Sequence, residues 1–108
     1  MNKIPYKTRR EIYLRAEQVN GLGKQLAVAI EELSEVQKEI CKLVRDKGDL
    51  DHLAEEIADA TIVLEQLRLF FVIGDEVDKQ MDAKLLRLAG DLGIRLEEED
   101  EADGEDRF

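Results

Sequence analysis

The chain has 108 residues, no Trp and a single Pro, and its formal net charge is −10. Its length predicts one domain, and its many Leu, Ala, Glu, Lys and Arg residues favour an all-α fold. The last twelve residues, 97–108, hold eight acids and one base, so the rest of the chain is only mildly acidic and offers no basic face for a nucleic-acid polymer.

Four helices are predicted, separated by glycine-containing turns. Pro5 can open the first helix, because its missing N–H would have no partner there, and Asn20-Gly21-Leu22-Gly23 ends it. The second helix is predicted from about Lys24 to Arg45. Its apolar stripe, expected to face the core, consists of Leu26, Ala29, Ile30, Leu33, Val36, Gln37, Ile40 and Val44.

The third helix is predicted from about Leu50 to Val72, with Asp49 or Asp51 as its N-cap. Its second half, ATIVLEQLRLFFVI, is apolar on nearly every face, which predicts burial on most sides by the domain itself or by a partner subunit. The fourth helix is predicted from about Glu76 to Ala89. Gly90 and Gly93 then end an ordered domain of residues 1–96, and the acidic tail 97–108 is expected to be disordered.

The lone Cys41 cannot form an internal disulfide, and its helical pattern predicts a small buried side chain. The chain has no apolar stretch of signal-peptide length at its start, and none approaches the ~20 apolar residues of a transmembrane helix. We therefore expect a reduced, cytoplasmic protein without a membrane partner.

Two acidic motifs carry the chemistry, Glu31-Glu32-Leu33-Ser34-Glu35 and Glu56-Ile57-Ala58-Asp59. Within each motif, Glu32 and Glu35, or Glu56 and Asp59, are three residues apart and share one side of a helix. The 20 residues between Glu35 and Glu56 suffice for a turn and an antiparallel partner helix, which would bring the two pairs face to face. Four converging carboxylates repel one another unless they are protonated, solvated or neutralised by a cation, and hard oxygen ligands suit Mg²⁺, with Mn²⁺ as the alternative.

The pattern also allows simpler interpretations. Glu pairs at this spacing usually lie on a solvated helix face, where we place Glu11, Glu17 and Glu39. Glu56 and Asp59, however, continue the apolar side of their helix. A di-iron bundle is disfavoured because it needs Glu-x-x-His pairs, and the only histidine, His52, lies four residues before Glu56.

At these motifs the chain resembles the MazG-like branch of the all-α NTP pyrophosphatase superfamily, whose pattern is Glu-Glu-x-x-Glu, a spacer and Glu-x-x-Asp. Here the pattern reads EELSE at 31–35 and EIAD at 56–59, and the resemblance spans about residues 22–88. It implies a MazG-type, four-helix bundle-like domain that dimerisation or tetramerisation completes. It also implies a small-molecule nucleotide substrate, hydrolysed with Mg²⁺ to a monophosphate and pyrophosphate.

The resemblance further assigns site residues. It implies that Glu32, Glu35, Glu56 and Asp59 bind the metal. Glu35 would orient or deprotonate the attacking water, and Glu31 would assist as a catalytic or additional ligand residue. Basic residues of a later helix would meet the phosphates, together with a polar residue near the nucleotide; the candidates are Lys79, Lys84, Arg87 and Gln25.

Two alternatives remain open at this point. The chain could be a non-catalytic helical interaction or regulatory protein that forms oligomers. It could also keep the same fold and act on phosphoribosyl-ATP or another nucleotide. The segment Gly21-Leu22-Gly23-Lys24 lacks the spacing of a P-loop, so phosphate binding is expected to rest on metal and side chains.

Overall fold

The computed structural model describes residues 3–97. In this part of the chain it contains four α-helices, α1 (Tyr6–Asn20), α2 (Leu22–Val44), α3 (Leu50–Phe70) and α4 (Gly74–Asp91), and no strand. The predicted all-α, bundle-like class is confirmed. The acidic tail predicted to be disordered lies, except for Glu97, outside the described residues.

The helix ends follow the local chemistry of the sequence. Pro5 is the N-cap residue of α1. A single residue, Gly21, then separates α1 from α2 in a conformation with φ 84° and ψ 153° that only glycine adopts readily. Asp49 caps α3, because its Oδ1 accepts a hydrogen bond of 2.8 Å from the Asp51 N–H. Gly90, predicted as a breaker, lies inside α4.

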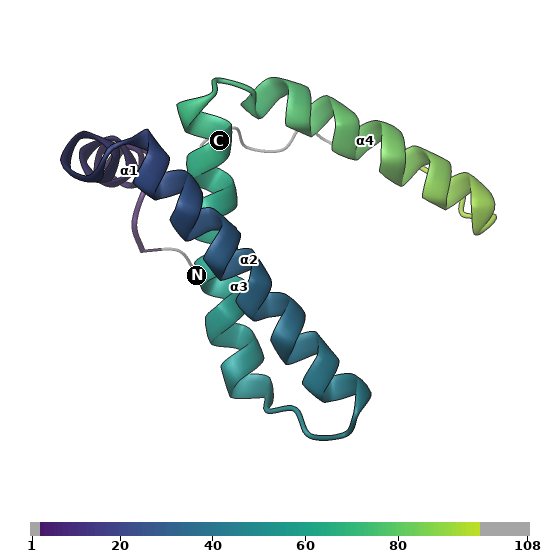
Figure 1. Cartoon of the computed structure of the whole chain (residues 1–108). Coiled ribbons are helices and arrows are strands. Elements are labelled where there is room, and N and C mark those ends of the chain that lie inside the picture. Colours follow the sequence, from purple (N-terminus) through teal and green to yellow (C-terminus); the bar gives the residue numbers. More distant parts are fainter. Residues whose placement is uncertain (1–2, 98–108) are drawn as a thin grey trace.

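Helices α2 and α3 form an antiparallel hairpin, which is the main packing unit of the chain (Figure 1). Small and medium side chains are buried on the two helices, among them Ala29 on α2 and Ala60 and Val63 on α3. Small residues allow the helix backbones to approach closely. The hairpin therefore places the acidic motif of α2 opposite that of α3.

The predicted core face of α2 is wrong in part. Gln25, Ala29 and Glu39 are the buried residues of this helix, whereas Ile30 and Val44 are 72% and 81% exposed. The face that meets α3 therefore carries polar as well as apolar residues, so hydrophobic periodicity alone did not locate it. Cys41, predicted to be buried, is exposed for the same reason.

Helix α1 is fixed to α3 by a polar cluster. The Arg9 guanidinium and the Tyr13 hydroxyl both donate hydrogen bonds to the carboxylate of Glu65. Tyr13 is buried, and this burial together with Glu65 raises its pKa to about 12. The phenol therefore stays protonated and remains a hydrogen-bond donor at neutral pH.

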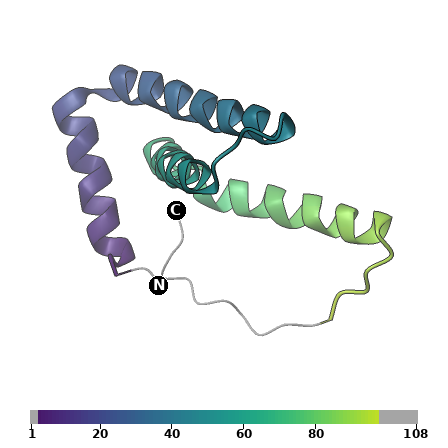
Figure 2. The same ribbon diagram turned by 90° about the horizontal axis from the view of Figure 1, so that it is seen from below.

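Helix α4 leads away from the hairpin and is joined to it at its start (Figures 1 and 2). Near this junction Arg68 donates hydrogen bonds to Asp78 (2.6 Å) and to the Gly74 carbonyl (3.2 Å). Val72, in the connection, has φ 53° and is 89% exposed. Ala89 is the only buried residue of α4, so the described part of the chain leaves this helix largely exposed.

The shape of the protomer reflects the extended position of α4. Its radius of gyration is 16.5 Å, whereas a compact chain of this length has about 13 Å.

No helix within residues 3–97 is both long enough and apolar enough to cross a membrane. The second half of α3 is not buried on every side within the chain, because Ile62 and Leu64 are exposed, as is Phe71 just after the helix.

Candidate metal centre

Three carboxylates converge where α2 faces α3. Glu32 on α2 and Glu56 and Asp59 on α3 each offer one oxygen, and these oxygens all lie within 4.8 Å of one another. Glu56 and Asp59 share a side of α3 because they are three residues apart. The antiparallel hairpin supplies the third carboxylate from the opposite helix, so these three residues converge as the sequence predicted.

The surroundings of these carboxylates favour their uncharged forms. Partial burial, hydrogen bonding to Asp59 and the negative charges of Asp59, Glu56 and Glu31 raise the pKa of Glu32 above its ordinary value. Partial burial and the neighbouring carboxylates, led by Asp59, also raise the pKa of Glu56. Two carboxyl groups can hydrogen-bond to each other only while they share a proton. A cation at this point would replace that proton and relieve the repulsion.

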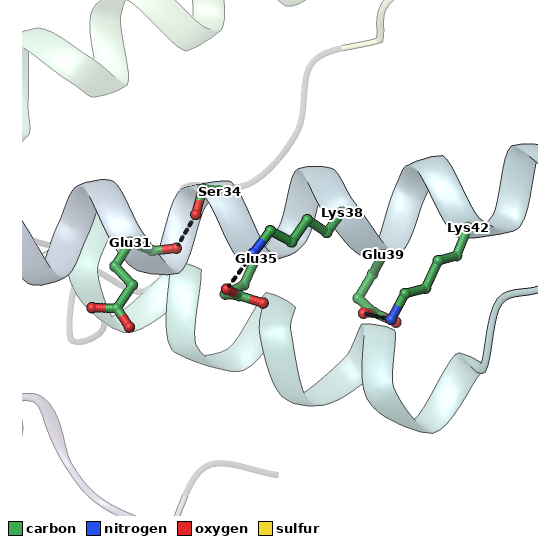
Figure 3. Close-up of polar contacts among 6 residues, drawn as sticks. All are labelled: Glu31, Ser34, Glu35, Lys38, Glu39 and Lys42. Carbon is green, nitrogen blue, oxygen red and sulfur yellow. Dashed lines mark hydrogen bonds and ion pairs between the residues drawn. The ribbon is translucent and has the colours of Figure 1, made fainter.

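The fourth predicted metal ligand, Glu35, is not part of this group of three. It is half-buried on α2, and its Oε1 accepts a hydrogen bond of 3.1 Å from the Lys38 ammonium (Figure 3). Its charge nevertheless contributes to the raised pKa of Glu56, so the two carboxylates lie within electrostatic reach of each other. Glu35 therefore lies beside the three converging carboxylates.

Glu31, predicted to act with Glu35, is exposed on α2. Its backbone carbonyl accepts a hydrogen bond of 2.7 Å from the Ser34 hydroxyl (Figure 3). Its charge contributes to the raised pKa of Glu32, which places it at the edge of the acidic site. A catalytic role for Glu31 stays a prediction.

Glu39 lies in a different environment from the one its sequence pattern predicts. It was expected on a solvated face, but it is only 6% exposed, and its Oε2 accepts a hydrogen bond of 3.0 Å from Lys42. The available signal was its spacing, because Glu39 follows Glu35 by four residues and both are followed after three residues by a lysine. Glu39 therefore extends the row of acidic residues on α2, formed by Glu32 and Glu35, by one further turn; we call these three residues the acidic line of α2.

The predicted substrate-binding residues do not gather around the carboxylates within the described chain. Lys79, Lys84 and Arg87 are exposed on α4, which extends away from the hairpin (Figure 1). Gln25 is buried on α2, seven residues before Glu32. Lys38 and Lys42 are the basic residues that form ion pairs with the acidic line of α2, at Glu35 and Glu39.

The donor set fits a hard divalent cation. Carboxylate oxygens are the ligands that Mg²⁺ and Mn²⁺ prefer, and within residues 3–97 the group contains no histidine or cysteine. Asp59 is exposed and Glu32 and Glu56 are only partly buried, so the site is open to a phosphate that would share the ion. His52 is exposed and lies outside the group, which leaves the di-iron pattern without its histidine.

Comparison of the chain with protein-family models, with curated proteins and with solved structures gives no match.

Proposed function

We propose that this protein is a divalent-metal-dependent nucleoside triphosphate pyrophosphohydrolase, as its resemblance to the MazG-like pyrophosphatases implies. The observation that carries the proposal is the convergence of Glu32, Glu56 and Asp59 from two antiparallel helices. Three carboxylates at this separation, two of them with a raised pKa, have an unfavourable charge balance that a divalent ion would correct.

The substrate of such a site would be a polyanion. A bound Mg²⁺ supplies Lewis-acid chemistry, since it screens the phosphate charge and polarises a phosphoryl oxygen. Glu32, Glu56 and Asp59 are the residues that would hold it. Glu35, beside them, is suited to accept a hydrogen bond from the attacking water and to take its proton. Hydrolysis at the α-phosphorus would yield a nucleoside monophosphate and pyrophosphate.

The phosphates would also need positive side chains, which lower the cost of the charge that builds on the leaving pyrophosphate. Lys38 and Lys42 lie along the acidic line of α2. Lys84 and Arg87 belong to α4, whose exposed apolar side chains include Met81, Leu85 and Leu86. We propose that a second copy of the chain covers these side chains and that α4 of one protomer serves the site of its partner in a dimer or tetramer.

The test is pyrophosphate release from a panel of standard and modified (d)NTPs and phosphoribosyl-ATP, with and without Mg²⁺. We expect Mg²⁺-dependent turnover of at least one nucleotide. Asp59→Asn should lower the rate by at least about 100-fold, because losing even an indirect partner of a metal ligand costs about 10- to 100-fold. Glu55→Gln is the matched control, since it removes one charge from an exposed neighbour on the same helix.

Two outcomes would overturn the proposal. One is near-full activity of Asp59→Asn, which would remove the assigned metal site. The other is the absence of turnover for every nucleotide together with an unfolding temperature that Mg²⁺ does not change. That second result would favour a non-catalytic helical interaction protein. If only phosphoribosyl-ATP were hydrolysed, the assigned metal site would stand and the substrate would be phosphoribosyl-ATP instead of a (d)NTP.

A further inference from the structure

A carboxylate oxygen is left without a partner at the interface of the hairpin. The side chain of Glu39 is only 8% exposed. Its Oε2 is bonded to Lys42, but its Oε1 is buried and has no hydrogen-bond partner among the described residues. A buried, unsatisfied oxygen of a charged group is costly, and such a group calls for a specific explanation.

The neighbours of Glu39 are other carboxylates. Glu35 lies four residues earlier, one turn away on the same side of α2, and the two side chains are directed toward α3 (Figure 3). Both charges contribute to the raised pKa of Glu56 on α3. Glu56 therefore connects Glu35 and Glu39 with the three converging carboxylates.

The five carboxylates at this contact between α2 and α3 carry more negative charge than the nearby lysines and one divalent ion can balance. The local cations are the ammonium groups of Lys38 and Lys42, both on partly exposed side chains. A single divalent ion together with these two lysines would still leave the five carboxylates with a net negative charge. The five carboxylates are those of Glu32, Glu35, Glu39, Glu56 and Asp59.

We propose that Glu39 and Glu35 bind a second divalent cation, next to the ion expected at Glu32, Glu56 and Asp59, and that Glu56 lies between the two sites. The unpartnered Oε1 of Glu39 is the ligand atom that points to it. In the absence of this ion the Lys42 ammonium balances the charge of Glu39; its long side chain can turn outward into solvent when the ion binds, while Lys38 stays beside Glu35. The inference builds on the proposed function, because it extends the same metal site.

The test counts Mn²⁺ ions bound to the full chain from the loss of the free-ion electron paramagnetic resonance signal during titration. We expect Glu39→Gln to bind one ion fewer per chain than the wild type. Glu32→Gln should lose the other ion and keep the one at Glu39. Glu35→Gln, whose side chain is more exposed, provides a second variant at the Glu39 end if Glu39→Gln folds poorly.

Glu55→Gln is the charge-matched control and should keep the wild-type number of ions. The inference is overturned if Glu39→Gln and Glu35→Gln both bind as many ions as the wild type, because Lys42 alone would then account for Glu39. It is also overturned if the wild type binds a single ion that Glu32→Gln removes, a result that would leave the proposed function standing. If Glu32→Gln binds as many ions as the wild type, the proposed function loses its metal site instead.

Discussion

At the scale of single residues, repulsion among carboxylates is the feature with the clearest consequence. Glu32 and Glu56 both have a pKa above the ordinary value of 4.5 because partial burial and neighbouring acids disfavour their charged forms. The folded protein therefore binds protons more tightly at these positions than the unfolded chain does. In the absence of metal, their contribution to stability is complete below pH 4.5 and is lost as the pH rises through their raised pKa values.

This linkage predicts how Glu32→Gln should behave, because the amide stays uncharged at every pH. The unfolding temperature of the metal-free variant should match that of the wild type near pH 4.5 and exceed it increasingly at higher pH. Saturating Mg²⁺ should reverse this order at neutral pH, because the wild type gains the ion and the variant does not. Thermal unfolding followed by circular dichroism between about pH 4 and about pH 8 provides the measurement. A difference that stays constant with pH would contradict the assigned electrostatics.

Residues also show where sequence patterns stop being informative. The i, i+3 spacing correctly brought together Glu56 and Asp59, and the antiparallel packing added Glu32, but the same spacing wrongly placed Glu35 in the group. It did not reveal that Glu39 is buried or that Cys41 is exposed. Those outcomes depend on the rotation of α2 against α3, which follows from packing along the whole hairpin.

At the scale of elements, the four helices were predictable because glycine and proline mark their ends. The predicted second helix starts two residues late, and the fourth was expected to end before Gly90, which lies inside α4. The choice of the buried face was less predictable. Ile30 and Val44 sit on the apolar side of α2, yet the residues of this helix that are buried are Gln25, Ala29 and Glu39. An acidic site between two helices requires polar residues on the contact face, and this requirement works against the hydrophobic pattern.

The one-residue break at Gly21 gives a test of how α1 and α2 are joined. Its φ of 84° and ψ of 153° suit glycine alone, so Gly21→Ala should lower the free energy of unfolding by about 1–3 kcal/mol. Gly23→Ala is a matched control inside α2 and should raise it by up to about 1 kcal/mol, because alanine is the better helix former. An added Cβ meets no atom within 4 Å at either glycine, so only the backbone differs. Urea unfolding measures the free energy of unfolding of both variants. Equal values would contradict the claim that the backbone conformation at Gly21 requires glycine.

At the scale of the whole molecule, the exposed apolar surface of α4 is the feature that one protomer does not explain. Leu85 and Leu86 are each 57% exposed, and Leu96 and Glu97, which follow α4, line a surface pocket together with them. Leu64 in the second half of α3 and Phe71 just after its end are also exposed. Apolar side chains grouped on adjoining elements are typical of a surface that another subunit covers.

We therefore predict that the wild type sediments as a dimer or tetramer at micromolar concentration and that Leu85→Glu/Leu86→Glu sediments as a monomer. Because both residues are more than half exposed, the charges should leave the helices intact in far-ultraviolet circular dichroism. Gln80→Glu adds a charge to the opposite side of α4 and should leave the assembly unchanged.

The same variant separates assembly from metal binding. If Lys84 and Arg87 serve the site of a partner subunit, the monomeric variant should lose pyrophosphate release while it still binds Mn²⁺. Glu32, Glu56 and Asp59 all come from one hairpin and do not need the partner to converge. A wild type that is monomeric, or a monomeric variant that retains full activity, would show that α4 does not complete the site of another subunit. The phosphates would then depend on basic residues of the same protomer, of which Lys38 and Lys42 lie along the acidic line.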